Sequence, residues 1–218
     1  MPLAWGKYVA DNIEGARFLE LPGRDIAPYF EHPEQTLDVI EEFLTGIPRD
    51  APTDRQLSTV VFTDIVDSTA LAEQLGDRRW RGMLDLHDDT ARNLVEDHAG
   101  QFVKTTGDGI LATFDGPGRA IRSASALERE LSKADLQIRT GIHTGEIELR
   151  HDDVGGIAVH LAGRIMALAG PAEILVSNTV KDLVIGSDIV FEDRGWHPLK
   201  GIESQWHLYS VIGTGSGV

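Results

Sequence analysis

Two aspartates stand at points of the sequence where a strand is expected to end or to turn. Asp64 lies near the end of residues 58–66, a β-branched run typical of a buried strand. Asp108 is the central residue of the Gly-Asp-Gly sequence at 107–109, which separates two alternating segments and predicts a hairpin. If the two strands are neighbours in one sheet, both carboxylates reach the same edge, where together with a backbone carbonyl they would bind Mg²⁺ or Mn²⁺ and leave positions open for phosphate oxygens. The alternative is that both aspartates only shape turns and cap helices.

The charge and composition of the chain limit which ligands such a site can hold. The chain has 218 residues, with 20 Lys and Arg against 35 Asp and Glu, and a formal net charge of −15. This charge repels a phosphate backbone or an anionic membrane, so we expect no nucleic-acid and no membrane partner. A small polyanion would need a divalent cation or a local basic cluster. The absence of cysteine excludes thiolate nucleophiles and cysteine zinc sites, which leaves oxygen and imidazole as metal ligands.

The elements that would position the two aspartates follow one another along residues 57–212. A long amphipathic helix is expected from about Trp80 to His98, because apolar residues recur on one helical face until Gly100. The other expected elements are hairpin strands at 102–106 and 110–114, a helix at 119–133, a strand at 136–145, a helix at 156–169, and strands at 173–177 and 206–211, with a short helix and a strand near 190 before the last. Strands therefore alternate with helices through this part of the chain.

The length of the chain allows one full domain and a small appendage. Residues 1–46 are expected to form a strand at 16–21 and a helix at 35–44, which is too little to fold alone. Residues 47–56 contain two prolines and no periodicity, which predicts a linker, and residues 213–218 predict a disordered tail. No apolar stretch approaches the roughly 20 residues that cross a bilayer, and the N-terminus lacks a signal-peptide pattern, so we expect a cytoplasmic protein.

Four segments in register resemble the catalytic domain of class III adenylyl and guanylyl cyclases. They are FTDIVDST at 62–69, FVKTTGDG at 102–109, GIHTG at 141–145 and DVGGIAVHLAGR at 153–164. The resemblance covers residues 57 to about 211 and implies an α+β, ferredoxin-like βαββαβ fold with a mixed, largely antiparallel sheet and flanking helices. It also implies a lyase that converts ATP to 3′,5′-cyclic AMP and pyrophosphate.

The resemblance assigns the metal ligands. In this family two divalent cations, Mg²⁺ or Mn²⁺, bridge the phosphates of the nucleotide, and the resemblance makes Asp64, Asp108 and the backbone carbonyl of Ile65 their ligands. Two cations roughly 3.5–4 Å apart stabilise both the attacking and the leaving oxygen of an in-line displacement. The cations would also allow an acidic chain to bind ATP.

The resemblance implies that Lys104 and Asp153 read the base. A lysine donor toward N1 and a carboxylate acceptor toward the exocyclic amine match adenine, whereas guanine inverts both groups, so this pair disfavours a guanylyl cyclase. The adjacent Asp152 is the less favoured partner, because one step along an extended loop points the other way. Without the resemblance, Lys104 is a charge on an edge strand and residues 151–153 are a solvated loop.

Three further residues complete the implied site. Arg164 would stabilise the charge that develops on the α-phosphate. His160 lies four residues earlier on the same helical face, at the position where the family usually has an asparagine that orients the ribose and phosphate. Histidine there either supplies a hydrogen bond or packs under the helix, and this departure makes a nucleotide-binding regulatory module with little turnover the alternative function. Lys200 is the only lysine in the C-terminal loop that could bind the triphosphate tail.

The resemblance also implies a symmetric homodimer with two shared active sites, in which the metal aspartates come from one subunit and the base-reading residues and Arg164 from the other. Residues 1–46 separately resemble the last strand and helix of α/β-hydrolases, as a remnant of an upstream domain in a longer parent protein. Ile26 follows Asp25 where such hydrolases place the triad histidine, and the chain has no Gly-x-Ser-x-Gly elbow. We therefore expect no hydrolase activity.

Overall fold

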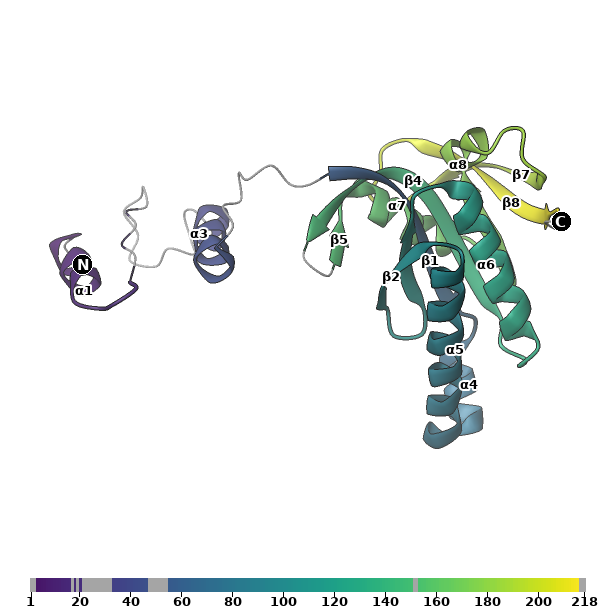
Figure 1. Cartoon of the computed structure of the whole chain (residues 1–218), viewed down its shortest axis with the longest axis horizontal. Coiled ribbons are helices and arrows are strands. Elements are labelled where there is room, and N and C mark those ends of the chain that lie inside the picture. The colour runs from purple at the N-terminus through teal and green to yellow at the C-terminus, as the bar shows by residue number, and fades with distance from the viewer. Residues whose placement is uncertain are drawn as a thin grey trace. The chain divides into compact units, whose positions relative to one another are not determined.

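The computed structural model describes residues 3–16, 18, 20, 33–46, 55–150 and 153–215. The chain divides into two compact units, Met1–Thr53 and Asp54–Val218. In the first unit, α1 spans Leu3–Asp11 and α3 spans Pro33–Thr45 (Figure 1). The helix α3 confirms the prediction at 35–44, whereas α1 was not predicted. The strand predicted at 16–21 lies partly outside the described residues, and its described members 16, 18 and 20 are not in a strand.

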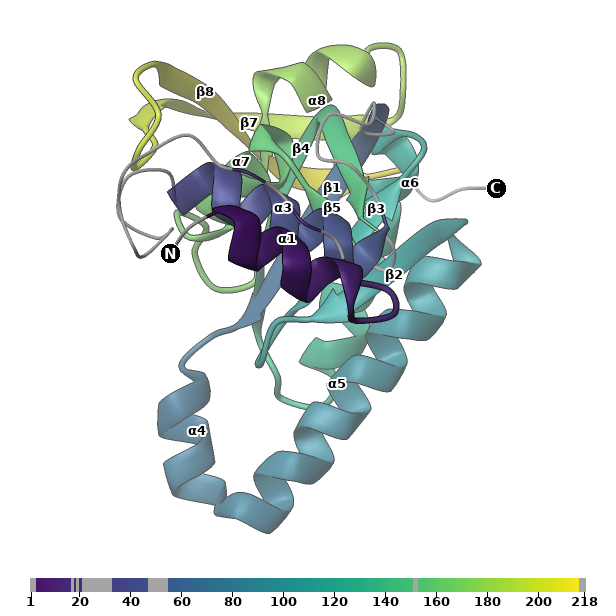
Figure 2. The ribbon, with the colours of Figure 1, turned by 90° about the vertical axis from the view of Figure 1, so that its left-hand side faces the viewer.

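The second unit contains the elements that were predicted to carry the site. Its strands are β1 (Arg55–Ile65), β2 (Gly100–Thr105), β3 (Ile110–Phe114), β4 (Ile138–Arg150), β5 (Asp153–Gly155), β6 (Ile174–Ser177), β7 (Ile189–Pro198) and β8 (Gln205–Thr214). Its helices are α4 (Ser68–Leu75), α5 (Asp77–Asp97), α6 (Pro117–Ser132), α7 (Ile157–Met166) and α8 (Asn178–Leu183). Figure 2 shows α4 following β1 and turning back into α5. Among the described residues, no helix is both long enough and apolar enough to span a bilayer.

The strands of the second unit form one mixed sheet. Within the described residues the sheet has eight strands, in the order β2-β3-β1-β4-β6-β8-β7, with β5 paired to β4. All pairs are antiparallel except β4 with β6. The first four strands have the order β2-β3-β1-β4, and helices connect β1 to β2 and β3 to β4. This is the ferredoxin-like βαββαβ arrangement, so the predicted fold class is confirmed.

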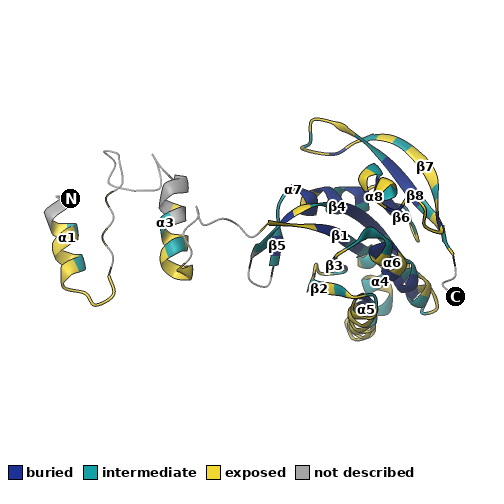
Figure 3. Cartoon of the chain, turned by 45° about the horizontal axis from the view of Figure 1, so that its top comes forward, coloured by how far each residue is buried: buried dark blue, intermediate teal, exposed yellow. Residues whose placement is uncertain are grey.

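Helices cover both faces of the sheet and bury an apolar core against each. The helices α5, α6 and α8 pack on one face, where Ala91, Ile121 and Val180 are fully buried. The helix α7 packs on the other face and buries Ala162 and Ile165. In Figure 3 the buried colour runs along the central strands and along parts of the helices that pack on them. The sheet ends that carry the two aspartates are thus attached to a rigid core.

Two predicted boundaries differ from the structure. The strand β8 continues through Thr214, because Gly213 and Thr214 pair with β7, so the predicted disordered tail at 213–218 begins too early. Residues 216–218 lie outside the described residues. The strand β1 begins at Arg55, because Arg55 and Gln56 pair with β4, so the strand includes the last two residues of the predicted linker at 47–56.

Candidate active site

The hairpin of β2 and β3 places Asp108 beside the end of β1, which carries Asp64. The Ile65 N–H donates a hydrogen bond to the Asp108 carbonyl at 2.9 Å. Gly109 permits this close approach, since a Cβ atom there would lie 1.9 Å from the Thr63 carbonyl oxygen. The carboxyl groups of Asp64 and Asp108 are close enough that each affects the pKa of the other. The structure therefore brings together the two aspartates that the sequence predicted to be neighbours.

An arginine that the sequence analysis did not single out pairs with Asp64. Arg139 lies opposite Asp64 in the β1–β4 register. Its Nε donates to Asp64 Oδ2 at 2.8 Å, and its Nη2 donates to the same oxygen. Only the register of β1 against β4 would have indicated this pair, because the two residues are 75 positions apart in the sequence.

The two aspartates have different electrostatic environments. Burial raises the pKa of Asp64 above its ordinary value, and the neighbouring Asp108 adds to this rise although the ion pair with Arg139 opposes it. Burial also acts to raise the pKa of Asp108, but hydrogen bonds from the Ser68 hydroxyl and from Asp64 outweigh it and hold that pKa below its ordinary value. Asp108 is thus the carboxylate that stays ionised more readily.

A cavity of about 620 Å³ opens beside the two aspartates, between the hairpin tip, β1 and α4. Its charged lining consists of Asp64, Asp67, Glu73, Asp108 and Arg139, so carboxylates outnumber guanidinium groups four to one. A bare triphosphate would be repelled there, whereas hard divalent cations prefer such oxygen donors. The donor set therefore fits Mg²⁺ or Mn²⁺.

A cation at this site would need further ligands from a bound phosphate compound. Across the part of the chain that the structure describes, no three His, Asp or Glu side chains converge as a metal site. Asp64 and Asp108 are the two carboxylates that the structure brings together, and Ile65 lies at the same strand end. Such a sparse set is typical of magnesium bound jointly by protein and phosphate oxygens.

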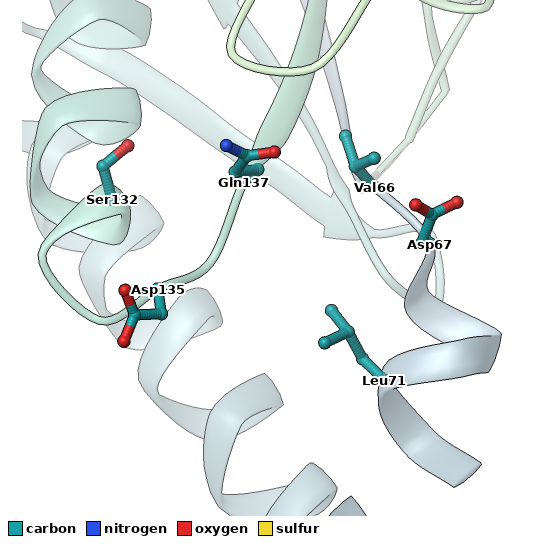
Figure 4. Close-up of a pocket in the computed structure, with 6 residues that line it drawn as sticks. All are labelled: Val66, Asp67, Leu71, Ser132, Asp135 and Gln137. Carbon is teal, nitrogen blue, oxygen red and sulfur yellow. The ribbon is translucent and has the colours of Figure 1, made fainter. Parts of the chain in front are cut away.

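A second cavity, of about 280 Å³, lies on the other side of the β1–α4 turn. Figure 4 shows the residues that line it, including Asp67, Asp135 and Gln137. The carboxyl groups of Asp67 and Asp135 point in different directions and do not converge on one point (Figure 4). This cavity therefore lacks the paired donors of the first.

Lys104 and Asp153, the predicted base readers, form an ion pair. Lys104 lies in β2 just after a register shift between Phe102 and Lys104, and such an irregularity re-aims a strand side chain. Asp153 opens the short strand β5 rather than belonging to a loop, because it pairs with Arg150 of β4. Its Oδ1 accepts a hydrogen bond from the Val154 N–H at 2.8 Å. The alternative partner, Asp152, lies outside the described residues.

The helix α7 carries His160 and Arg164. It packs directly on β4 at Gly141, where a Cβ atom would lie 2.1 Å from the Met166 nitrogen. His160 is exposed, so it does not pack under the helix as one of the two interpretations required. The Arg164 guanidinium is half-buried and lies near Gly201, 3.7 Å from the position of a Cβ atom there. The exposed Lys200 precedes Gly201, so the loop that carries Lys200 lies beside Arg164.

Two groups of these residues are in contact within one chain, Asp64 with Asp108 and Lys104 with Asp153. The cavity beside Asp64 and Asp108 is lined by residues of β1, α4, the hairpin tip and β4. Among its described lining residues there is none of the other predicted site residues, Lys104, Asp153, His160, Arg164 and Lys200. The structure therefore brings the metal-binding candidates together and the base-reading candidates together, but does not bring the two groups into one cavity.

Paired carboxylates at one end of a ferredoxin-like sheet suit metal-dependent chemistry on phosphates, and comparison with known sequences identifies the family. A sequence profile of the adenylate and guanylate cyclase catalytic domain matches residues 52–213. The chain therefore belongs to the adenylate and guanylate cyclase catalytic domain family.

Individual relatives agree with this assignment. A Rhizobium meliloti protein provisionally named adenylate cyclase 3 is 31% identical over 172 residues, which cover 72% of this chain and 28% of that protein. An adenylate cyclase of Streptomyces coelicolor is 30% identical over 134 residues, which cover 61% of this chain and 35% of that protein. The chain thus spans only about a quarter to a half of the length of the curated relatives that it matches.

Solved structures share the fold. The adenylyl cyclase CyaB of P. aeruginosa has a TM-score of 0.68 and 24% identity, covering 75% of this chain and 97% of that one. An adenylate/guanylate cyclase/hydrolase of Silicibacter pomeroyi has a TM-score of 0.61 and 28% identity, covering 73% of this chain and 98% of that one.

Proposed function

We propose that residues 57–212 form an adenylyl cyclase that converts ATP to 3′,5′-cyclic AMP and pyrophosphate. The observation that carries this proposal is the Lys104–Asp153 ion pair in a chain that also pairs Asp64 with Asp108. In the reaction, the ribose 3′ oxygen forms a bond to the α-phosphorus, and the bond from the α-phosphorus to the bridging oxygen of pyrophosphate breaks. The 3′ proton leaves to solvent or to a phosphate oxygen.

Asp64, Asp108 and the Ile65 carbonyl are the residues that would hold two divalent cations. When bound, these cations neutralise the phosphates and lower the pKa of the attacking hydroxyl. Arg139 contributes the positive charge within the cavity, and the low pKa of Asp108 keeps one carboxylate ionised for binding.

Lys104 and Asp153 would select the base. Their ion pair leaves an ammonium and a carboxylate side by side, one to donate to adenine N1 and the other to accept from the exocyclic amine. Guanine would place a donor against Lys104 and an acceptor against Asp153, so both contacts would be lost.

Arg164, His160 and Lys200 would act on the phosphates and the ribose. Arg164 has no ion pair or side-chain hydrogen bond among the described residues, so its guanidinium is available to stabilise charge on the α-phosphate. The exposed His160 can donate one hydrogen bond to the ribose or phosphate. Lys200, beside Arg164, would bind the terminal phosphates.

The active enzyme would be a homodimer with two shared sites. The two groups of site residues do not meet in one cavity of a single chain, and a symmetric pair can bring the metal group of one subunit to the base-reading group of the other. Both sites would then use the same interface.

Cyclic AMP formation by the purified chain with Mn²⁺ and ATP tests this proposal. Turnover should be abolished in Asp108→Ala, and GTP should be a poor substrate. An Asp108→Ala protein as active as the wild type would reject the mechanism, and GTP turnover equal to that with ATP would indicate a guanylyl or unselective cyclase.

A regulatory nucleotide-binding module is the second candidate. His160 favours it, because an imidazole at this position lacks the paired donor and acceptor of an amide. Measurable ATP affinity without product would support this module. Under the cyclase proposal, His160→Asn should preserve or raise turnover.

A further inference from the structure

The β1–α4 segment fixes the backbone of Asp108. The Ile65 N–H donates to the Asp108 carbonyl, and the Ile110 N–H donates to the buried Thr63 hydroxyl at 3.1 Å. The tip of the hairpin is therefore held against β1 at Asp108 and again at Ile110. The position of the Asp108 Cα atom follows from these contacts alone, but the direction of its carboxylate does not.

A hydroxyl from the same segment holds the carboxylate. Ser68, the first residue of α4, donates a hydrogen bond from Oγ to Asp108 Oδ2. Asp67, just before it, adopts a left-handed backbone conformation with φ of 53°, so the chain turns sharply between β1 and α4. This turn brings the Ser68 hydroxyl back to the hairpin tip, 40 residues away in the sequence.

The hydroxyl holds Asp108 in a different way from the arginine that holds Asp64. The Arg139 guanidinium carries a full positive charge and is paired with Asp64, so it competes with a cation for that carboxylate. Ser68 is neutral and donates to Oδ2 of Asp108, so it adds no charge that would compete with a cation, although Asp64 and the Asp108 backbone also contact this carboxylate. When both carboxylates are ionised they repel each other, and a hydrogen bond from a neutral hydroxyl opposes a rotation of Asp108 away from Asp64.

We infer that Ser68 is a positioning residue, which aims the Asp108 carboxylate at the cation site that it shares with Asp64. This inference rests on the proposed function, because it concerns the same metal site. Outer-shell hydrogen bonds to metal ligands typically contribute about 10- to 100-fold in metal affinity. Ser68 does not itself bind the cation or touch the reacting atoms in this role.

Mn²⁺ binding to the full chain tests the inference. The binding is measured from the electron paramagnetic resonance signal of free Mn²⁺. The titration contains 3′-deoxy-ATP, which supplies phosphate ligands but lacks the attacking hydroxyl and cannot cyclise. Ser68→Ala should weaken Mn²⁺ binding by about 10-fold or more. Ser68→Thr, which retains a hydroxyl, should bind Mn²⁺ nearly as the wild type does. Ser132→Ala, which removes a hydroxyl from the end of α6 outside this cavity, should leave the affinity unchanged.

The substitutions Ser68→Thr and Ser68→Val form a second pair, equal in shape and different only in the hydroxyl. This pair keeps the test decisive if the alanine variant is poorly folded, since Val alone should lose affinity. Equal Mn²⁺ affinity in Ser68→Thr and Ser68→Val would overturn the inference. Asp108→Asn separates the two proposals: if the wild type binds Mn²⁺ no better than this variant, the metal site and with it the proposed function are wrong.

Discussion

The Lys104–Asp153 pair illustrates how a surface contact can matter for selectivity without mattering for stability. Each side chain is 47% exposed, and an ion pair in such a position contributes at most about 1 kcal/mol to folding. The hairpin and β5 are held by backbone pairing and by the core beneath them. The fold therefore depends little on this pair, which we propose contacts the base of the nucleotide.

We expect Lys104→Gln to change selectivity far more than stability. The free energy of unfolding should fall by less than about 1 kcal/mol, while the ratio of ATP to GTP turnover should fall by about tenfold or more, as loss of a base contact allows. Chemical denaturation and initial rates with each nucleotide measure the two effects. Lys133→Gln breaks a similarly exposed pair with Glu130, remote from the site, and should leave the ratio unchanged. A preserved ratio in Lys104→Gln would remove this lysine from base recognition.

Buried His143 should make stability depend on pH. Burial lowers its pKa to about 4 from the ordinary 6.5, while the ring accepts or donates one hydrogen bond with Ser177 at 2.8 Å. The unfolded chain then binds the extra proton between pH 6.5 and 4, so stability is full above this window and falls as the pH decreases through it, by about 3 kcal/mol in total.

Urea unfolding of His143→Gln across this pH window checks the expectation. The variant should lose most of the pH-dependent slope that the imidazole causes. Ser177→Ala removes the hydrogen-bond partner but keeps the buried imidazole, so it should retain the slope. Equal slopes in the wild type and His143→Gln would contradict the assignment.

Two glycines set the spacing of the elements that carry the site. Gly109 lets the hairpin tip meet β1, and Gly141 lets α7 meet β4 with no side chain between them. A methyl group at either position would have to displace backbone atoms, which yield less than side chains do. The positions of Asp108 and Arg164 therefore depend on residues that take no part in the chemistry.

Gly141→Ala should destabilise the domain by at least about 2 kcal/mol, because its Cβ atom would lie 2.1 Å from a helix nitrogen. Gly82→Ala is the matched control, since Gly82 lies within α5 with nothing within 4 Å of its Cβ position. That substitution should stabilise the domain by about 0.5–1 kcal/mol. Denaturant melts of both variants give the comparison, and a neutral Gly141→Ala would show that α7 can shift without cost.

Periodicity predicted α5, α6, α7 and most strands to within a few residues, because their apolar residues recur at the spacing of a buried face. It did not predict β5, since three residues carry too little pattern to identify a strand. Arg139 and Ser68 were not singled out for a related reason. Each acts on a residue distant in sequence, through strand register in one case and a left-handed turn in the other, and neither is encoded by local spacing.

The whole molecule carries a net charge of −15, and the cavity beside Asp64 and Asp108 is likewise lined by more carboxylates than basic groups. From the composition we expect cations at this cavity, because the negative charge of the chain repels a bare triphosphate. The family motifs predicted which residues would form the site, and the structure brings together Asp64 with Asp108 and Lys104 with Asp153. Sequence patterns within one chain cannot state how a second copy completes the site, so the dimer stays a prediction.

Mixing two inactive variants tests the shared site. Asp64→Ala and Lys104→Ala should each be inactive alone, and together should recover about a quarter of wild-type activity, because half of randomly formed dimers are mixed and each mixed dimer has one intact site. Tagged subunits verify that mixed dimers form. If verified mixed dimers have no activity, the model of active sites shared between two subunits is rejected.

The β2–β3 hairpin carries Lys104 on its strand and Asp108 at its tip. In a symmetric pair of subunits, Lys104 of this hairpin would contact the adenine of one nucleotide while Asp108 held the metal of the second nucleotide. Adenine bound to Lys104 at one active site would then reduce the mobility of Asp108, the metal ligand of the other active site. A plot of turnover against ATP concentration should therefore depart from a simple hyperbola.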